Sequence, residues 1–113
     1  MSPAAVEPAP LDARLRPLGA DDRLDAPALE AQLAQLPGWS VRDGALERDY
    51  RFPDFDSAMA FAQAAASLAA RQDHHPELRI EWGRCIVRWH THSAHGITMN
   101  DVVCAALLDA PGG

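Results

Sequence analysis

The sequence predicts an α+β domain in which three helices pack on one face of a four-stranded antiparallel sheet, in the order α-β-β-α-β-β-α. Apolar residues recur with a helical period in three stretches and alternate with polar residues in four shorter stretches. The strands come in two pairs, each joined by a short turn sequence, which favours hairpins. Such a sheet has one apolar face, and helices are the elements that cover it.

Length and composition limit the classes of protein to which this chain can belong. The 113 residues correspond to one domain, and 10 basic against 16 acidic residues give a net charge of −6. That balance argues against a nucleic-acid binder held by phosphate contacts. No run of 18 apolar residues exists and the first residues do not resemble a secretory signal, so we expect neither a membrane span nor secretion. Cys85 and Cys104 lack zinc-site or CxxC spacing, which favours buried, reduced thiols in a cytoplasmic protein.

The folded unit is expected to occupy only part of the chain. Residues 1–23 contain four prolines and no sustained apolar period, so we expect a flexible tail. The domain is predicted over residues 24–110, and residues 111–113 form a short C-terminal tail.

The first helix is predicted to begin after Asp25, whose side chain can cap it, with Pro27 in its first turn. Three leucines then follow at i, i+4 and i+7, the spacing of one buried face. Pro37-Gly38 ends the helix.

A hairpin is predicted next, from Trp39 to Phe52. Its turn is Asp43-Gly44, a dipeptide that tolerates the positive φ angles of tight hairpin turns. A long helix follows, from its cap Asp54 to about Arg71. The buried stripe expected for this helix comprises Phe55, Ala58, Met59, Ala62, Ala65 and Ala69. Its small side chains permit close approach to a sheet or to another subunit.

The second hairpin is predicted on either side of a Gly83-Arg84 turn. Leu78, Ile80 and Trp82 share a face of one strand, and apolar residues from Cys85 onward alternate along the other. The last helix is predicted to begin at about Thr98. Thr98 and Asp101 resemble a capping box in which aspartate replaces the usual glutamate or glutamine.

Counting outward from that turn predicts where the histidines meet. Pro76 lies seven residues before Gly83 and Thr91 seven residues after Arg84, so His75 and His92 are expected at one end of the sheet. His74 lies beside them. Imidazole can give or take a proton near neutral pH, so this convergence predicts acid and base chemistry.

The histidines allow two other interpretations. His90 on the polar face of a strand and His95 in a loop are expected to be surface groups without a functional role. Three histidines can also hold catalytic zinc. Adjacent side chains such as His74 and His75 diverge in extended chain, however, and no HExxH motif or cysteine partner is present. We therefore expect no metal and no other cofactor.

These residues carry a resemblance to a known family. The stretch His74-His75-Pro76, followed by Trp82, Thr91-His92 and Asp101, resembles the signature of the pterin-4a-carbinolamine dehydratases. Gly38-Trp39 and Phe52-Pro53-Asp54-Phe55 also look like family positions. The resemblance runs from about Asp25 to Ala110, nearly the whole predicted domain.

The resemblance implies an enzyme that removes water from a 4a-hydroxytetrahydropterin to give the quinonoid dihydropterin. It implies that His74, His75 and His92 form the catalytic site, and that Asp101 caps the last helix and orients the site loop. The positions that it implies as substrate contacts are Trp39, Pro76, Thr91, Ser93 and Ala94. Trp39 is equally suited to the core. The family also implies a homodimer or homotetramer, which agrees with the alanine-rich helical faces of so short a domain.

Three positions depart from the family pattern. Ala70 stands where the family carries a charged residue or histidine, Asn100 where a basic residue is common, and His95 where a small residue is usual. A missing polar partner puts turnover in question. A second function therefore stays open: a noncatalytic relative that binds proteins, such as an assembly factor for Rubisco subunits in bacteria with carboxysomes.

Overall fold

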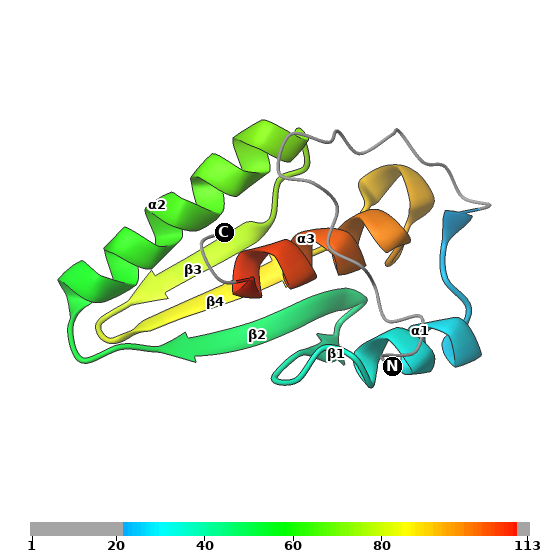
Figure 1. Ribbon diagram of the computed structural model, residues 1–113, viewed down its shortest axis with the longest axis horizontal. Coiled ribbons are helices and arrows are strands. Elements are labelled where there is room, and N and C mark those ends of the chain that lie inside the picture. Colours follow the sequence, from blue (N-terminus) through cyan, green and yellow to red (C-terminus); the bar gives the residue numbers. More distant parts are fainter. Residues whose placement is uncertain (1–21, 111–113) are drawn as a thin grey trace.

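The computed structural model describes residues 22–110, and the predictions for residues 1–21 and 111–113 lie outside that range. The predicted α+β class and element order are confirmed (Figure 1). The elements are α1 (Ala26–Leu33), β1 (Ser40–Arg42), β2 (Ala45–Arg51), α2 (Phe55–Gln72), β3 (Glu77–Glu81), β4 (Arg84–Trp89), the 3₁₀ turn η2 (His92–Ala94) and α3 (Met99–Asp109).

The four strands form one antiparallel sheet in the order β1-β2-β4-β3, so β4 is central and β3 is an edge. α2 packs on β3 and β4, and α3 packs on β4 and β2 (Figure 1). α1 contributes Leu29 and Leu33 to the margin of the same core. Between the helices and the sheet, Leu46, Val87 and Trp89 are fully buried. None of the helices within residues 22–110 has the length and apolar character needed to cross a bilayer.

The helix starts agree with their predicted caps. Asp25 accepts a hydrogen bond from Ala28 N at 2.9 Å, and Asp54 accepts one from Ser57 N at 2.8 Å. Thr98 and Asp101 form the predicted capping box of α3. These contacts join residues two or three positions apart in the sequence, which is why the sequence alone could predict them.

The predicted faces of the helices need two corrections. α1 ends at Leu33, several residues before Pro37-Gly38, although Leu36 is still buried. Phe55, the first residue of α2, is 44% exposed, and Met59 is only partly buried, so neither belongs to the buried stripe, which instead extends to Leu68 and Gln72.

The turn of the second hairpin lies one residue earlier than predicted. Glu81 pairs with Arg84, so the turn is Trp82-Gly83, with Gly83 at φ +71°. Glycine adopts this left-handed conformation without steric cost, which makes it the residue that fixes the turn. Trp82 is consequently 74% exposed at the turn instead of facing the core. Every pairing in the hairpin is shifted by two residues relative to the prediction.

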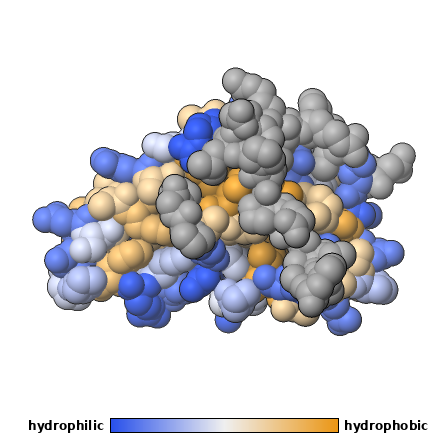
Figure 2. Space-filling model, in the orientation of Figure 1, coloured by the Kyte–Doolittle hydropathy of each residue, from blue (hydrophilic) through white to orange (hydrophobic). Residues whose placement is uncertain are grey.

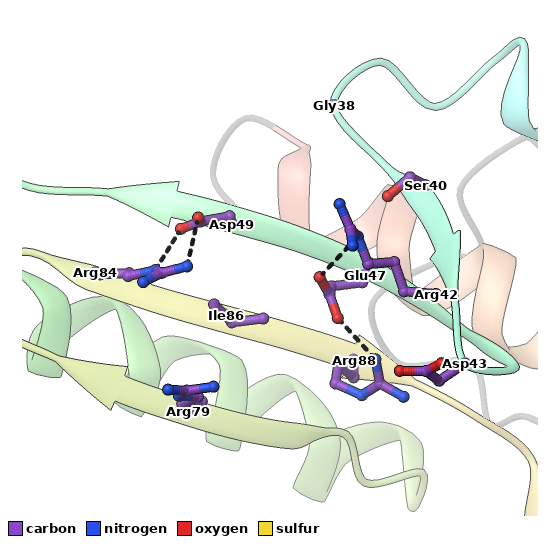
Figure 3. Close-up of a pocket in the computed structure, with 10 residues that line it drawn as sticks. All are labelled: Gly38, Ser40, Arg42, Asp43, Glu47, Asp49, Arg79, Arg84, Ile86 and Arg88. Carbon is purple, nitrogen blue, oxygen red and sulfur yellow. Dashed lines mark hydrogen bonds and ion pairs between the residues drawn. The ribbon is translucent and has the colours of Figure 1, made fainter.

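The second face of the sheet is polar. Figure 3 shows charged side chains of β2, β3 and β4 on this face, with Arg84 directed at Asp49 and Arg88 at Glu47. Arg84 Nη2 lies 3.2 Å from Asp49, and Arg88 Nη1 lies 2.7 Å from Glu47. The two faces therefore differ in chemistry: one is apolar and covered by helices, and the other consists largely of ion pairs.

Candidate active site

A cavity of about 410 Å³ opens where α2 has ended and β4 passes into η2. Its lining consists of Asp73, His74, His75, His90, Thr91, His92 and Ser93. The structure thus brings His74, His75 and His92 to one cavity, although they come from two segments of the chain. The segment before β3 supplies the first two, and the segment after β4 supplies the third.

The end of α2 determines where the first two histidines lie. Asp73 caps the helix in the left-handed conformation, with φ 52° and ψ 43°, and its N–H bonds to Ala69 O. This residue turns the chain out of the helix, so His74 and His75 follow in the short segment that leads to β3. His74 points inward, with its side chain 14% exposed, whereas His75 is exposed.

His74 is held on two sides. Its Nε2 lies 2.6 Å from the Asp101 carboxylate, and its ring stacks on Trp89 with the planes 9° apart and the centroids separated by 5.6 Å. A carboxylate can only accept, so His74 donates its Nε2–H. In the neutral form of the ring, the lone pair is then on Nδ1. This contact fixes both the orientation and the tautomer of the imidazole.

Asp101 joins the cap of α3 to the site. Its side chain is fully buried and accepts hydrogen bonds from Thr91 Oγ1 at 2.7 Å and from Thr98 N at 2.9 Å, in addition to His74. Thr91 and Thr98 also bond to each other through their hydroxyl groups at 2.8 Å. Asp101 therefore caps the helix as predicted, and its role in orienting the site loop stays a prediction.

The loop that carries His92 is closed by backbone hydrogen bonds. Thr91 N donates to Gly96 O at 2.9 Å, and Gly96 N returns the bond to Thr91 O at 3.4 Å. The 3₁₀ turn fits between them and ends at His95, whose φ is 55°. His92 projects from this closed loop with an exposed side chain.

The remaining predicted contacts divide into two groups. Ser93 lines the cavity, and Thr91 lines it while being nearly buried. Pro76 and Ala94 are neighbours of lining residues in the sequence but do not belong to the lining. Their role as substrate contacts stays a prediction.

Trp39 lies elsewhere. It is 7% exposed, and its Nε1 donates to the Asp109 carboxylate at 2.7 Å, at the C-terminal end of α3. Asp101 lies in the first turn of the same helix, so Trp39 and the histidines are at opposite ends of it. The structure does not bring Trp39 to the cavity, and its partnership with Asp109 gives it a place in the core.

Asp109 collects two further donors from β2. Arg48 Nη1 donates at 2.9 Å and Tyr50 OH at 2.5 Å. Burial, with added contributions from the Asp109 carboxylate, raises the pKa of Tyr50 well above its usual range. This cluster fastens the end of α3 to the sheet and is separate from the histidine cavity.

A larger hollow, of about 630 Å³, lies on the polar face of the sheet (Figure 3). Arg88 bridges Glu47 and Glu77, and Arg84 bridges Asp49 and Glu81. Because these arginines are already neutralised by carboxylates, the hollow has no concentrated charge to attract a ligand. The smaller cavity, with its converging imidazoles, is the candidate active site.

Metal chemistry gains no support from the geometry. Within residues 22–110, no group of three or more histidine, cysteine or acidic side chains is arranged to hold a metal ion. The residues of the cavity suit proton transfer instead.

His90, for which the sequence predicted no role, also lines the cavity. A sequence prediction that placed the turn at Trp82-Gly83 would have put His90, and not His92, opposite His75.

Comparison with known proteins adds independent information. Residues 22–110 match the family described as Pterin 4 alpha carbinolamine dehydratase. A relative from Stenotrophomonas maltophilia (strain K279a), named "Putative pterin-4-alpha-carbinolamine dehydratase", is 43% identical over 94 residues, which are 81% of each chain. A relative of the same name from Xanthomonas oryzae pv. oryzae (strain PXO99A) is 42% identical over 78% of this chain and 76% of its own.

A solved structure is also similar. It is the crystal structure of a transcriptional coactivator/pterin dehydratase from Brucella melitensis, with a TM-score of 0.74 and 35% sequence identity. The match covers 80% of this chain and 99% of that one. The similarity therefore extends over nearly the whole of the Brucella chain.

Proposed function

This chain belongs to the pterin-4a-carbinolamine dehydratase family, and on that premise we propose that it removes water from a 4a-hydroxytetrahydropterin, giving the quinonoid dihydropterin. The observation that carries the proposal is the group of three histidines around one cavity, with the ring of His74 fixed by a buried carboxylate. His74, His75 and His92 are the residues to which we assign the catalysis.

The reaction needs two proton transfers. The bond between C4a and its hydroxyl oxygen breaks, and that oxygen leaves as water after it receives a proton. The proton on N5 is removed, and the electron pair of the N5–H bond becomes available to form the double bond between N5 and C4a. Imidazoles can serve as the acid and the base for these steps near neutral pH. The balance of atoms and electrons requires no oxidant, reductant or organic cofactor.

The geometry favours different tasks for the three histidines. His74 gives its Nε2–H to Asp101, which leaves Nδ1 as an acceptor and suits His74 to receive a proton or a substrate hydrogen bond. His75 and His92 are exposed at the cavity mouth, where they can exchange protons with water. Thr91 and Ser93, which line the cavity, are the proposed substrate contacts.

The test is the dehydration rate on freshly generated 4a-hydroxytetrahydropterin. We expect His75→Ala and His92→Ala each to lower kcat by about 10²-fold or more, the usual contribution of a positioned acid or base. The free energy of unfolding should change little, because both side chains are exposed. His95→Asn is the matched control: it removes a histidine outside the cavity, at a positive φ that asparagine tolerates.

Two results would contradict the proposal. Rates within a few-fold of the wild type in both alanine variants would exclude the histidine mechanism. A dehydration rate that is lost on chelation and restored by zinc would show that catalysis depends on a metal ion instead.

The noncatalytic alternative makes a different prediction. A protein that binds partners such as Rubisco subunits would keep its fold and show no dehydration above the uncatalysed rate. Ala70, exposed in the last turn of α2, is one of the sequence features that motivate this alternative. The intact histidine group favours the enzyme.

A further inference from the structure

His90 lies beside two of the proposed catalytic histidines. In the β3–β4 ladder, Glu77 pairs with Arg88, and continuing this register by two residues brings His75 opposite His90. The ring of His90 also approaches the ring of His92, with the centroids 4.8 Å apart and the planes at 73°. His90 is half-buried and belongs to the lining of the cavity. Register, ring contact and lining agree on its position.

The side chain of His92 needs a constraint that its own loop does not supply. It is exposed, and the backbone hydrogen bonds that close its loop hold the main chain and not the imidazole ring. An exposed side chain samples several rotamers, and holding it in one of them costs conformational entropy. The edge-to-face contact with the less exposed ring of His90 is a favoured aromatic geometry and selects one orientation.

We propose that His90 is a positioning residue that holds the imidazole of His92 toward the cavity. This inference rests on the proposed function, because orientation matters only if His92 transfers a proton. His90 itself then needs no proton: an aromatic ring at this place is sufficient. That requirement separates positioning from acid or base catalysis by His90.

The experiment compares His90→Ala with His90→Phe. Loss of the ring should lower kcat about threefold to tenfold, the factor that an edge-to-face aromatic contact is worth. KM should stay unchanged, because the contact orients the imidazole that transfers the proton and does not take part in substrate binding. Phenylalanine retains an aromatic edge and should restore most of the lost kcat. His95→Asn, which removes a histidine outside the cavity, should leave kcat unchanged.

Several outcomes would overturn the inference. If both variants lose kcat equally, the imidazole nitrogens of His90 matter and its ring alone is not enough. If KM rises at constant kcat, His90 binds substrate. If neither constant changes, His90 has no part in the reaction.

A second measurement does not depend on activity. In the ¹H–¹³C spectrum of the free protein, the ring signals of His92 should carry a ring-current shift that His90→Ala removes and His90→Phe retains. Unchanged His92 signals in His90→Ala would refute the contact. A wild-type protein without dehydratase activity would refute the proposed function, while these signals would still decide whether His90 orients His92.

Discussion

Replacing Asp101 by asparagine should disable the site without unfolding the protein. The carboxylate presents one oxygen to His74 Nε2 at 2.6 Å and the other to Thr91 and Thr98. Asparagine has the same shape but only one acceptor oxygen. If that oxygen keeps the two threonine contacts, the amide NH₂ faces His74 and forces its Nε2 to accept. The proton of the imidazole must then move to Nδ1, so the tautomer is reversed while the geometry is preserved.

The expected magnitudes separate catalysis from stability. A histidine in the wrong tautomer cannot act as the required base, so we expect kcat for Asp101→Asn to fall by about 10²- to 10⁴-fold. The free energy of unfolding should fall by about 1–2 kcal/mol, because a neutral hydrogen bond replaces a charge-assisted one. Asp101→Ala should cost about 3–5 kcal/mol, since it removes the cap and leaves two further buried donors without an acceptor.

Three assays test this reasoning together: guanidinium unfolding, the dehydration rate, and long-range ¹H–¹⁵N spectra that report which nitrogen of His74 carries the proton. Asp56→Asn, in the first turn of α2, is the matched control and should leave the rate and the tautomer unchanged. An Asp101→Asn protein with wild-type kcat would refute the claim that Asp101 sets a catalytic tautomer. An unchanged His74 tautomer with a large loss of rate would refute it as well.

Four further predictions concern the rest of the molecule. Asp109→Ala should lower the free energy of unfolding by about 2–3 kcal/mol, because buried Trp39 Nε1 and two donors of β2 lose their acceptor; an unfolding midpoint within error of wild type would contradict this. Burial raises the pKa of the Cys104 thiol to about 12, so a thiol reagent at pH 8 should label this residue only after denaturation, and rapid labelling of the native protein would be inconsistent with this. The free energy of unfolding should also decline as the pH rises above about 9, because the thiol of the unfolded chain loses its proton before that of the folded protein does. Ala70→Glu should raise kcat if the missing polar partner limits turnover, because a carboxylate near the histidines favours and orients a protonated imidazole. Steady-state kinetics compare the two proteins, and an unchanged kcat would show that the missing partner does not limit turnover. The protein should form dimers or tetramers at micromolar concentration, because so short a domain has limited scope for a large core and the face in Figure 2 shows exposed apolar residues; a monomer by light scattering would rule this out.

Local contacts explain how much of the fold the sequence could predict. Asp25, Asp54 and Thr98 cap their helices because each side chain reaches an N–H group only two or three residues ahead. The Asp43-Gly44 turn is fixed by the two positive φ angles that these residues tolerate, 48° and 78°. Such interactions depend on neighbours in the chain, so composition and spacing were sufficient to predict them.

The hairpin register could not be fixed in the same way. Moving the turn from Gly83-Arg84 to Trp82-Gly83 shifts every pairing by two residues. Side chains alternate along a strand with a period of two, so this shift leaves each apolar side chain on the same face. The hydrophobic pattern is therefore equally compatible with both registers, and only the observed pairing of Glu81 with Arg84 distinguishes them. If the observed register is continued two residues beyond the Glu77–Arg88 pair, His90 lies opposite His75.

Contacts between distant segments were decided by tertiary structure alone. The sequence by itself determined the element order, the helix caps, the first hairpin and the group of histidines near one end of the sheet. The strand order β1-β2-β4-β3 and the bond from Trp39 to Asp109, 70 residues apart, depend on how the helices lie across the sheet. Trp39 has the apolar character of both a substrate wall and a core residue. Only the packed structure supplies the acceptor for its N–H, and that acceptor holds it in the core, away from the histidine cavity.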